Sequence, residues 1–339
     1  MPLADRAGQV LMVGVPASLP ASAATLVRRN HVGGVFLRGR TAVSAGTLAR
    51  RSAALQRVAV AVGGPRLHVA ADQEGGLVQT LSGPGFARIP SAVEQGRWDG
   101  ASLRRRTQSW AGALRAAGVT MNLAPVADTV SAADRTRNPP IGAVRRNYGE
   151  TPAAVAADVA QVVGGFHDAG VVATLKHFPG LGRVRANTDV STRAVDALTT
   201  PADPNLGPFR AGLGAGAEAV MISSARYPQL DADHVAAFSP AVVTGLLRER
   251  LGFGGLVVSD DLGSAVAVRV LSPGRRAVSF VAAGGDLVLT NRSTDAAPMR
   301  AALIAQAQRS APFRHRLDDA VVHILTTKQH HALLTCSTR

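Results

Sequence analysis

Eight short runs of consecutive apolar residues, rich in β-branched side chains, recur along the chain. They cover residues 10–15, 34–37, 67–71, 119–124, 171–175, 219–222, 256–259 and 287–290. Runs that are apolar at every position, rather than at every second one, are typical of strands buried on both faces of a parallel sheet. The pattern therefore predicts eight parallel strands.

Stretches with helical spacing of Ala, Leu and Arg separate these runs. They cover residues 41–60, 102–117, 152–169, 208–215, 240–251 and 273–283, and a last helix is expected at about 317–334. Pro152, Pro208 and Pro240 stand where proline is favoured, at helix starts, and Thr151 and Ser239 are suitable N-caps. The pattern predicts helices that alternate with the strands.

Eight strand–helix units in one chain predict a (β/α)8 TIM-like barrel. A doubly wound open sheet is the alternative, but no GxGxxG follows the first run, which argues against dinucleotide binding. No long Pro-, Gly- or Ser-rich linker divides the chain. We therefore expect one catalytic domain over residues 1–339, in which 314–339 form a C-terminal helix and tail.

Composition narrows the possible partners. The net charge is +14, but the arginines are scattered and aromatic residues make up only 4%. Base-stacking platforms are therefore not expected, and nucleic acid is not the predicted ligand. No apolar stretch is long enough to span a membrane. Cys336, the single cysteine, excludes an intramolecular disulfide and a site with several Cys ligands.

Localisation stays open at this stage. No signal peptide is visible at the start of the chain, so a cytoplasmic protein is expected unless a signal or lipid-anchor segment is missing from it. In that case the cell envelope or secretion is expected. The sequence does not determine the oligomeric state, and we expect a monomer.

Charged and polar residues follow several of the predicted strands, where a barrel of this type carries its chemistry. They are Asp72 after the third run, Asp128 after the fourth, Lys176 and His177 after the fifth, Ser223 and Ser224 after the sixth, and Asp260 and Asp261 after the seventh. We interpret Asp128 and Asp261 as capping or salt-bridged carboxylates. The stretch 175–189 is central, because it places Lys176 and His177 at a strand end and continues into a Gly-containing basic arm that ends at Asp189.

Carboxylates beside Lys, His and Arg suit a polyhydroxylated ligand, because charged groups can bond adjacent hydroxyls. Paired carboxyl groups are also what glycoside hydrolysis requires. The sequence contains no metal-ligand cluster, Walker motif or nucleophile elbow. Acid/base chemistry without a metal or other cofactor is the consistent interpretation.

The chain resembles glycoside hydrolase family 3, in particular the single-domain bacterial β-N-acetylglucosaminidases. The matching segments, in family order, are GQVLMVGV (8–15), GGVFL (33–37), ADQEGGLVQ (71–79), GPGFARIPSA (83–92), NLAPVAD (122–128), RRNYG (145–149), LKHFPG (175–180) and FSPAVVTGLLRERLGFGGLVVSDDL (238–262). The resemblance implies a TIM-like barrel, in agreement with the strand count.

The resemblance also implies roles for individual residues. Asp260, the first Asp of VVSDDL, matches the family's nucleophile, which forms a covalent glycosyl-enzyme with retention of configuration. Four residues match positions that hold sugar hydroxyls in the −1 subsite: Asp72, Arg146, Lys176 and His177.

The sequence departs from the family where the general acid/base is expected. Relatives usually carry Asp-Ser/Thr-His on the loop after KHFPGHG, whereas this chain has Asn187, Thr188 and Asp189 there, and Leu181 replaces the His of the turn. We expect Asp189 itself to serve as acid/base, which requires a raised pKa, although Arg183 and Arg185 would lower it. Alternatively, Asp189 is structural and the proton donor lies elsewhere.

Three further positions differ from common family residues: Leu77 and Thr80 stand where relatives carry Arg, and Ser224 where many carry His. We predict a retaining exo-β-N-acetylglucosaminidase that acts on peptidoglycan fragments or chitooligosaccharides. The alternatives are a β-glucosidase or β-xylosidase of the same fold, and a catalytically weakened glycan-binding wall protein.

Overall fold

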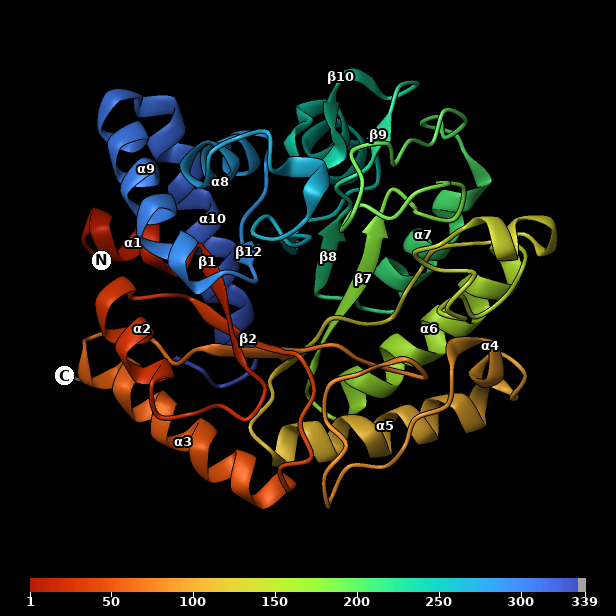
Figure 1. Cartoon of the computed structure of the whole chain (residues 1–339), viewed down its shortest axis with the longest axis horizontal. Coiled ribbons are helices and arrows are strands. Elements are labelled where there is room, and N and C mark those ends of the chain that lie inside the picture. The colour runs from red at the N-terminus through yellow and green to blue at the C-terminus, as the bar shows by residue number, and fades with distance from the viewer. Residues whose placement is uncertain (335–339) are drawn as a thin grey trace.

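The protein is a closed parallel barrel, seen in a computed structural model that describes residues 1–334. Eight strands form one sheet in the order β11-β8-β7-β6-β3-β2-β1-β12, and every neighbouring pair is parallel. A parallel bridge between Val258 and Leu287 joins β11 to β12 and closes the ring. The predicted (β/α)8 barrel is confirmed (Figure 1).

All eight predicted strands are present. They are β1 (Leu11–Pro16), β2 (Gly34–Arg38), β3 (His68–Ala71), β6 (Met121–Asn122), β7 (Val172–Phe178), β8 (Ala219–Ile222), β11 (Leu256–Ser259) and β12 (Val288–Thr290). Almost every residue in them is buried, as expected for strands covered by side chains inside the barrel and by helices outside it.

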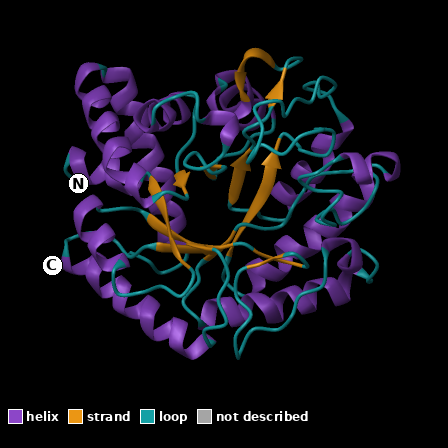
Figure 2. Cartoon of the chain, viewed as in Figure 1, coloured by secondary structure: helices purple, strands orange, loops and turns teal. Residues whose placement is uncertain are grey.

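Helices surround the strands on the outside (Figure 2). They are α1 (Leu3–Gln9), α2 (Ala23–Asn30), α3 (Ala45–Ala61), α4 (Ala92–Gln95), α5 (Gly100–Ala116), α6 (Pro152–Asp168), α7 (Gly207–Gly214), α8 (Pro273–Ala282), α9 (Ala296–Arg309) and α10 (Ala311–His330), together with the π-helix η4 (Ala241–Arg250). The described part of the chain also contains 3-10 helices: η1 (Ala132–Arg137), η2 (Pro204–Leu206), η3 (Ala236–Phe238), η5 (Val266–Val268) and η6 (Ser293–Asp295).

The helix boundaries agree with the caps in the sequence. The Thr151 hydroxyl accepts a hydrogen bond from the Ala154 amide, and Pro152 opens α6. The last helix begins earlier than expected, at Ala311, because the Ser310 hydroxyl accepts from the Phe313 amide and caps it. None of the helices within residues 1–334 combines the length and apolarity that a membrane crossing requires. Cys336 lies outside the described residues.

Two short hairpins extend the barrel at the carboxyl ends of its strands. The first, β4 (Gln73–Gly75) with β5 (Val78–Gln79), follows β3, and the second, β9 (Arg226–Tyr227) with β10 (Asp231–Val235), follows β8. Together with the long loop after β7, these hairpins surround the end of the barrel at which the parallel strands terminate.

Candidate active site

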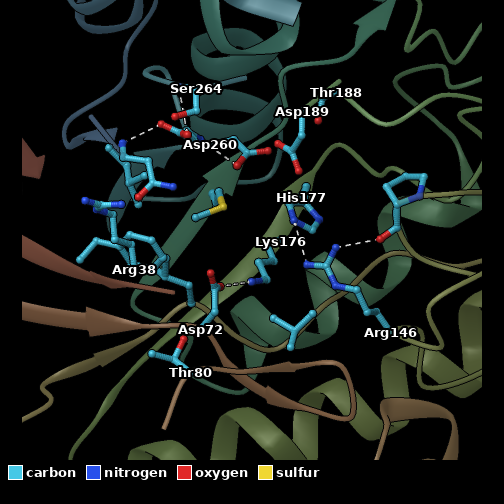
Figure 3. A pocket seen from close by; sticks show the side chains of 18 of the residues that line it. Arg38, Asp72, Thr80, Arg146, Lys176, His177, Thr188, Asp189, Asp260 and Ser264 are labelled. Atoms are coloured by element: carbon cyan, nitrogen blue, oxygen red, sulfur yellow. Dashed lines mark hydrogen bonds and ion pairs between the residues drawn. The ribbon is translucent and has the colours of Figure 1, made fainter. Parts of the chain in front are cut away.

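A cavity of about 420 Å³ opens at the carboxyl ends of the barrel strands. All six residues proposed from the sequence as catalytic or substrate-binding line it: Asp72, Arg146, Lys176, His177, Asp189 and Asp260. Figure 3 shows them converging from different strands and loops. The barrel thus brings these six residues, which lie up to 188 positions apart (72 to 260), into one cavity.

Lys176 lies at the floor of this cavity, near the end of β7, and its side chain is only 2% exposed. Its Nζ lies 2.6 Å from Asp72 Oδ1 and 2.5 Å from Glu74 Oε1. Two carboxylates therefore compensate the cost of burying the ammonium group. The pairing also orients Asp72 at the cavity surface, where its other oxygen can accept a hydrogen bond from a ligand.

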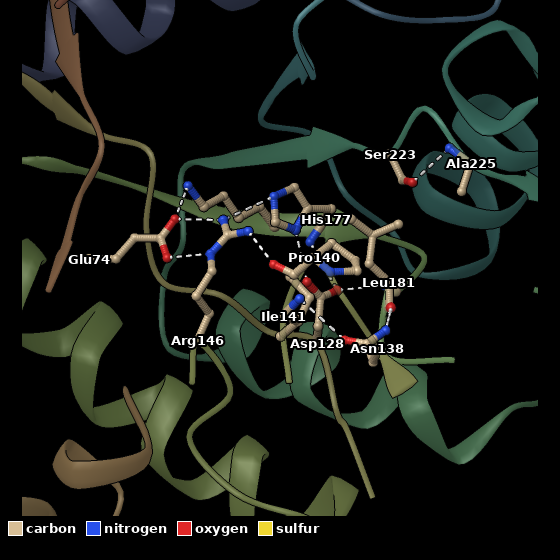
Figure 4. A network of polar contacts seen from close by, with 12 residues as sticks. Glu74, Asp128, Asn138, Pro140, Ile141, Arg146, His177, Leu181, Ser223 and Ala225 are labelled. Atoms are coloured by element: carbon tan, nitrogen blue, oxygen red, sulfur yellow. Dashed lines mark hydrogen bonds and ion pairs between the residues drawn. The ribbon is translucent and has the colours of Figure 1, made fainter. Parts of the chain in front are cut away.

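Glu74, which carried no role in the sequence analysis, connects Lys176 to Arg146. The Arg146 guanidinium donates to it from Nε and Nη2, both at 2.8 Å, and donates from Nη1 to the Pro140 carbonyl at 2.8 Å (Figure 4). Burial alone would raise the pKa of Glu74, but the charges of Arg146 and Lys176 outweigh it and lower the pKa to about 2. In the sequence, only its position two residues after Asp72 could have indicated that Glu74 belongs to the site.

Replacing this buried carboxylate should destabilise the protein. Glu74→Gln leaves Arg146 and Lys176 with one carboxylate fewer, and we expect a loss of about 3–5 kcal/mol in the free energy of unfolding. Because the pKa is lowered in the folded state, the difference from wild type should be fully present above about pH 4.5 and decline as the pH falls toward 2. Urea unfolding at several pH values measures it.

Glu249→Gln is the matched control for this measurement, because Glu249 is exposed and forms no ion pair within residues 1–334. It should change stability by less than about 0.5 kcal/mol. Equal effects of the two substitutions would show that the buried network contributes nothing specific.

His177 is held from behind by Asp128. Its Nδ1 lies 2.8 Å from Asp128 Oδ2, and Asp128 Oδ1 accepts from the backbone amides of His177 and Leu181. A carboxylate only accepts, so Nδ1 carries the hydrogen and Nε2 faces Arg146 at 3.4 Å. Asp128 is fully buried, and its contacts agree with the interpretation of this residue as structural.

Asp260 follows β11 and presents its carboxyl group to the cavity. Its Oδ1 accepts from the Asp261 amide at 2.8 Å, and its remaining acceptor sites form no hydrogen bond within the described part of the chain. Asp261 is different, because it accepts from the amides of Gly263 and Asn291 at 2.7 and 2.8 Å and so stabilises the turn. The two neighbouring aspartates therefore differ: Asp261 stabilises the turn, and the Asp260 carboxylate is available to a ligand.

Asp189 stands at the mouth, on the loop after β7. The loop is bonded to the segment that follows Asp260, since the amides of Val266 and Ala267 donate to the carbonyls of Asp189 and Thr188 at 3.2 and 3.1 Å. The residue is exposed, but its carboxyl group points into the cavity (Figure 3). Enclosure of this group, followed by the negative charges of Asp260 and Asp261, raises its pKa to about 6, although His177 and Arg146 act in the opposite direction.

The arginines of this loop form ion pairs with aspartates other than Asp189. Arg183 donates to Asp203 at 2.6 and 3.2 Å, and Arg185 donates to Asp134 at 2.7 Å. These arginines, expected to lower the pKa of Asp189, are therefore neutralised by their own partners. Among residues 1–334, no group of three or more His, Cys, Asp or Glu side chains is arranged to hold a metal ion.

Comparison with known proteins identifies the family. The model of the glycosyl hydrolase family 3 N-terminal domain matches residues 2–327. The chain belongs to this family. It is a glycoside hydrolase, and the resemblance found in its motifs is confirmed.

Named relatives of this glycoside hydrolase are similar over most of their length. A β-hexosaminidase of Stenotrophomonas maltophilia (strain K279a) is 36% identical over 292 residues, which cover 83% of this chain and 82% of the relative. A β-hexosaminidase of Xylella fastidiosa (strain M23) is 39% identical over 271 residues, or 77% and 76% of the two chains. The crystal structure of a β-N-acetylhexosaminidase from Beutenbergia cavernae DSM 12333 superposes with a TM-score of 0.94 and 42% identity, covering 97% of this chain and 99% of that one.

Proposed function

We propose that this glycoside hydrolase is a retaining exo-β-N-acetylglucosaminidase that releases single sugars from peptidoglycan fragments or chitooligosaccharides. The β-hexosaminidases to which it is similar support the choice of sugar. The observation that carries the mechanism is the pairing of Asp260 with Asp189, two carboxyl groups that face one cavity from different elements. The charge of Asp260 helps to keep a proton on Asp189.

The first step forms the glycosyl-enzyme. A carboxylate oxygen of Asp260 attacks C1 of the terminal sugar, the bond from C1 to the glycosidic oxygen breaks, and Asp189 gives its proton to that departing oxygen. In the second step Asp189, now ionised, takes a proton from water as the water oxygen bonds to C1 and Asp260 is released. Two displacements at C1 retain the β configuration.

The floor of the cavity binds the sugar that reacts. Asp72 accepts hydrogen bonds from hydroxyls, Lys176 and Arg146 donate to hydroxyls, and His177 accepts through Nε2. Because Glu74 and Asp128 fix these side chains, little conformational entropy remains to be lost when the sugar binds. A rigid, charge-balanced floor is suited to a neutral sugar with several hydroxyl groups.

A panel of aryl β-glycosides tests this proposal. We expect the N-acetylglucosaminide to be cleaved with a kcat/KM at least about 100-fold above those of the glucoside and xyloside, and the first product to be the β-anomer by NMR. Preference for glucoside or xyloside would favour the alternative of another glycosidase. Saturable binding of glycan without hydrolysis of any substrate would favour a wall protein with lost activity.

A further inference from the structure

The end of β2 carries two arginines at the cavity that the proposed mechanism does not use. Arg38, Gly39 and Arg40 all line the cavity, and all three are exposed at its mouth. Gly39 has φ +79, a left-handed conformation that favours glycine, and it turns the chain so that both flanking side chains reach the same opening. We call residues 38–40 the arginine turn.

Register places the arginine turn directly beside the residues that bind the sugar. In the β2–β3 ladder Leu37 pairs with Ala71, so Arg38, the last residue of β2, lies beside Asp72, which directly follows β3. Asp72 is already paired with Lys176 at 2.6 Å, and in Figure 3 Arg38 and Lys176 lie on either side of it. Arg38 is thus adjacent to Asp72, which we propose binds the sugar, and it lies outside the charge-balanced floor.

The side chains of Arg38 and Arg40 differ in their hydrogen bonding. Arg40 donates from Nη2 to the Leu77 carbonyl at 2.5 Å and so holds the tip of the β4–β5 hairpin. The Arg38 side chain forms no hydrogen bond and no ion pair with any residue from 1 to 334. A guanidinium group at the edge of a substrate cavity, with its fork of donors unoccupied, is well suited to bind a carboxylate.

Depth in the cavity indicates which part of the substrate Arg38 meets. The floor residues Lys176 and His177 are buried, whereas the arginine turn lies at the opening. In an exo-acting enzyme the terminal sugar fills the floor and the remainder of the substrate leaves through the mouth. We infer that Arg38 selects substrates whose leaving sugar bears a carboxylate, over neutral oligosaccharides of the same linkage.

This inference rests on the proposed function and makes it more specific. A disaccharide of N-acetylglucosamine β-1,4-linked to N-acetylmuramic acid carries a lactyl carboxylate on its leaving sugar, and the methyl ester of that acid is the same molecule without the charge. We expect the wild type to prefer the acid. Arg38→Met should lower the ratio of kcat/KM for acid over ester by about 10- to 100-fold, as the loss of a charge-assisted hydrogen bond predicts.

Two further variants and a measurement of the dependence on ionic strength complete the test. Arg38→Lys should restore part of the preference, because a point charge replaces the fork. Arg28→Met, which removes an exposed arginine of α2 that does not line the cavity, should leave the ratio at the wild-type value. The preference for the acid should weaken as ionic strength rises, since Arg38 is open to solvent.

The outcomes separate this inference from the function on which it rests. Hydrolysis of both disaccharides at a ratio that Arg38→Met does not change, or that Arg28→Met changes equally, overturns the role of Arg38 alone. If neither disaccharide is hydrolysed, the proposed function is overturned. In that case calorimetric binding of acid and ester to wild type and Arg38→Met still decides whether Arg38 recognises the carboxylate.

Discussion

Asp260→Ala is expected to reduce kcat on a chromogenic N-acetylglucosaminide by about 10⁴-fold or more, while the protein stays folded. Asp260 supplies the atom that bonds to C1, and removal of a nucleophile abolishes the covalent route rather than weakening a contact. Within residues 1–334 the side chain accepts one hydrogen bond, from the neighbouring Asp261 amide, so its loss should leave the barrel intact. Steady-state kinetics and a thermal melt together measure the effect.

Azide provides a direct assignment of the nucleophile in this variant. The space left by the carboxylate can admit this small anion, which would attack C1 from the face that Asp260 uses and yield the α-glycosyl azide with an activated substrate. Asp233→Ala is the control, because Asp233 is exposed on β10 and does not line the cavity. Undiminished turnover by Asp260→Ala, or a β-glycosyl azide as product, would remove Asp260 from the proposed role.

Asp189→Ala is expected to separate substrates by their leaving groups. Turnover of the natural disaccharide, which needs a proton on the departing oxygen, should fall by about 10²- to 10⁴-fold. The kcat/KM of a 2,4-dinitrophenyl glycoside, which reports only the first step, should fall by about 10-fold or less, because this leaving group departs without protonation. Comparison of kcat/KM on the two substrates measures the effect.

The pH profile adds an independent readout for Asp189. A general acid works in its protonated form, and the pKa of Asp189 is raised to about 6 by enclosure and by Asp260. The kcat/KM of wild type on the disaccharide should therefore decline as the pH rises above about 6, and this limb should be absent in Asp189→Ala. Equal losses on both substrates, or an unchanged alkaline limb, would show that the proton donor lies elsewhere.

The substitution and the pH profile both test a carboxylic acid in the place where the family resemblance leads us to expect a histidine. A carboxyl group on a hydrated loop would lose its proton well below neutral pH. Here the loop is tied to the segment after Asp260 by two backbone hydrogen bonds, which keep Asp189 near a second negative charge. The arginines of the loop are paired with Asp203 and Asp134, so they do not cancel this effect.

The sequence by itself determined the barrel and the residues that meet at its opening. Runs apolar at every position can be satisfied only by burial on both faces, and eight such runs separated by helices close into one ring. Because parallel strands end at the same edge, the residues following them had to converge, and Asp72, Lys176 and Asp260 do so.

Only the tertiary structure decided how these residues are held. Glu74 meets Arg146 across 72 positions, and Asp128 meets His177 across 49, through side-chain contacts that no local pattern specifies. The inward direction of Asp189 depends on hydrogen bonds to Val266 and Ala267, and the open guanidinium of Arg38 depends on Asp72 having Lys176 as its partner. Periodicity reports which face of a strand or helix is buried, whereas the proton affinity and the partner of a charged group depend on which other charges the folded chain places beside it.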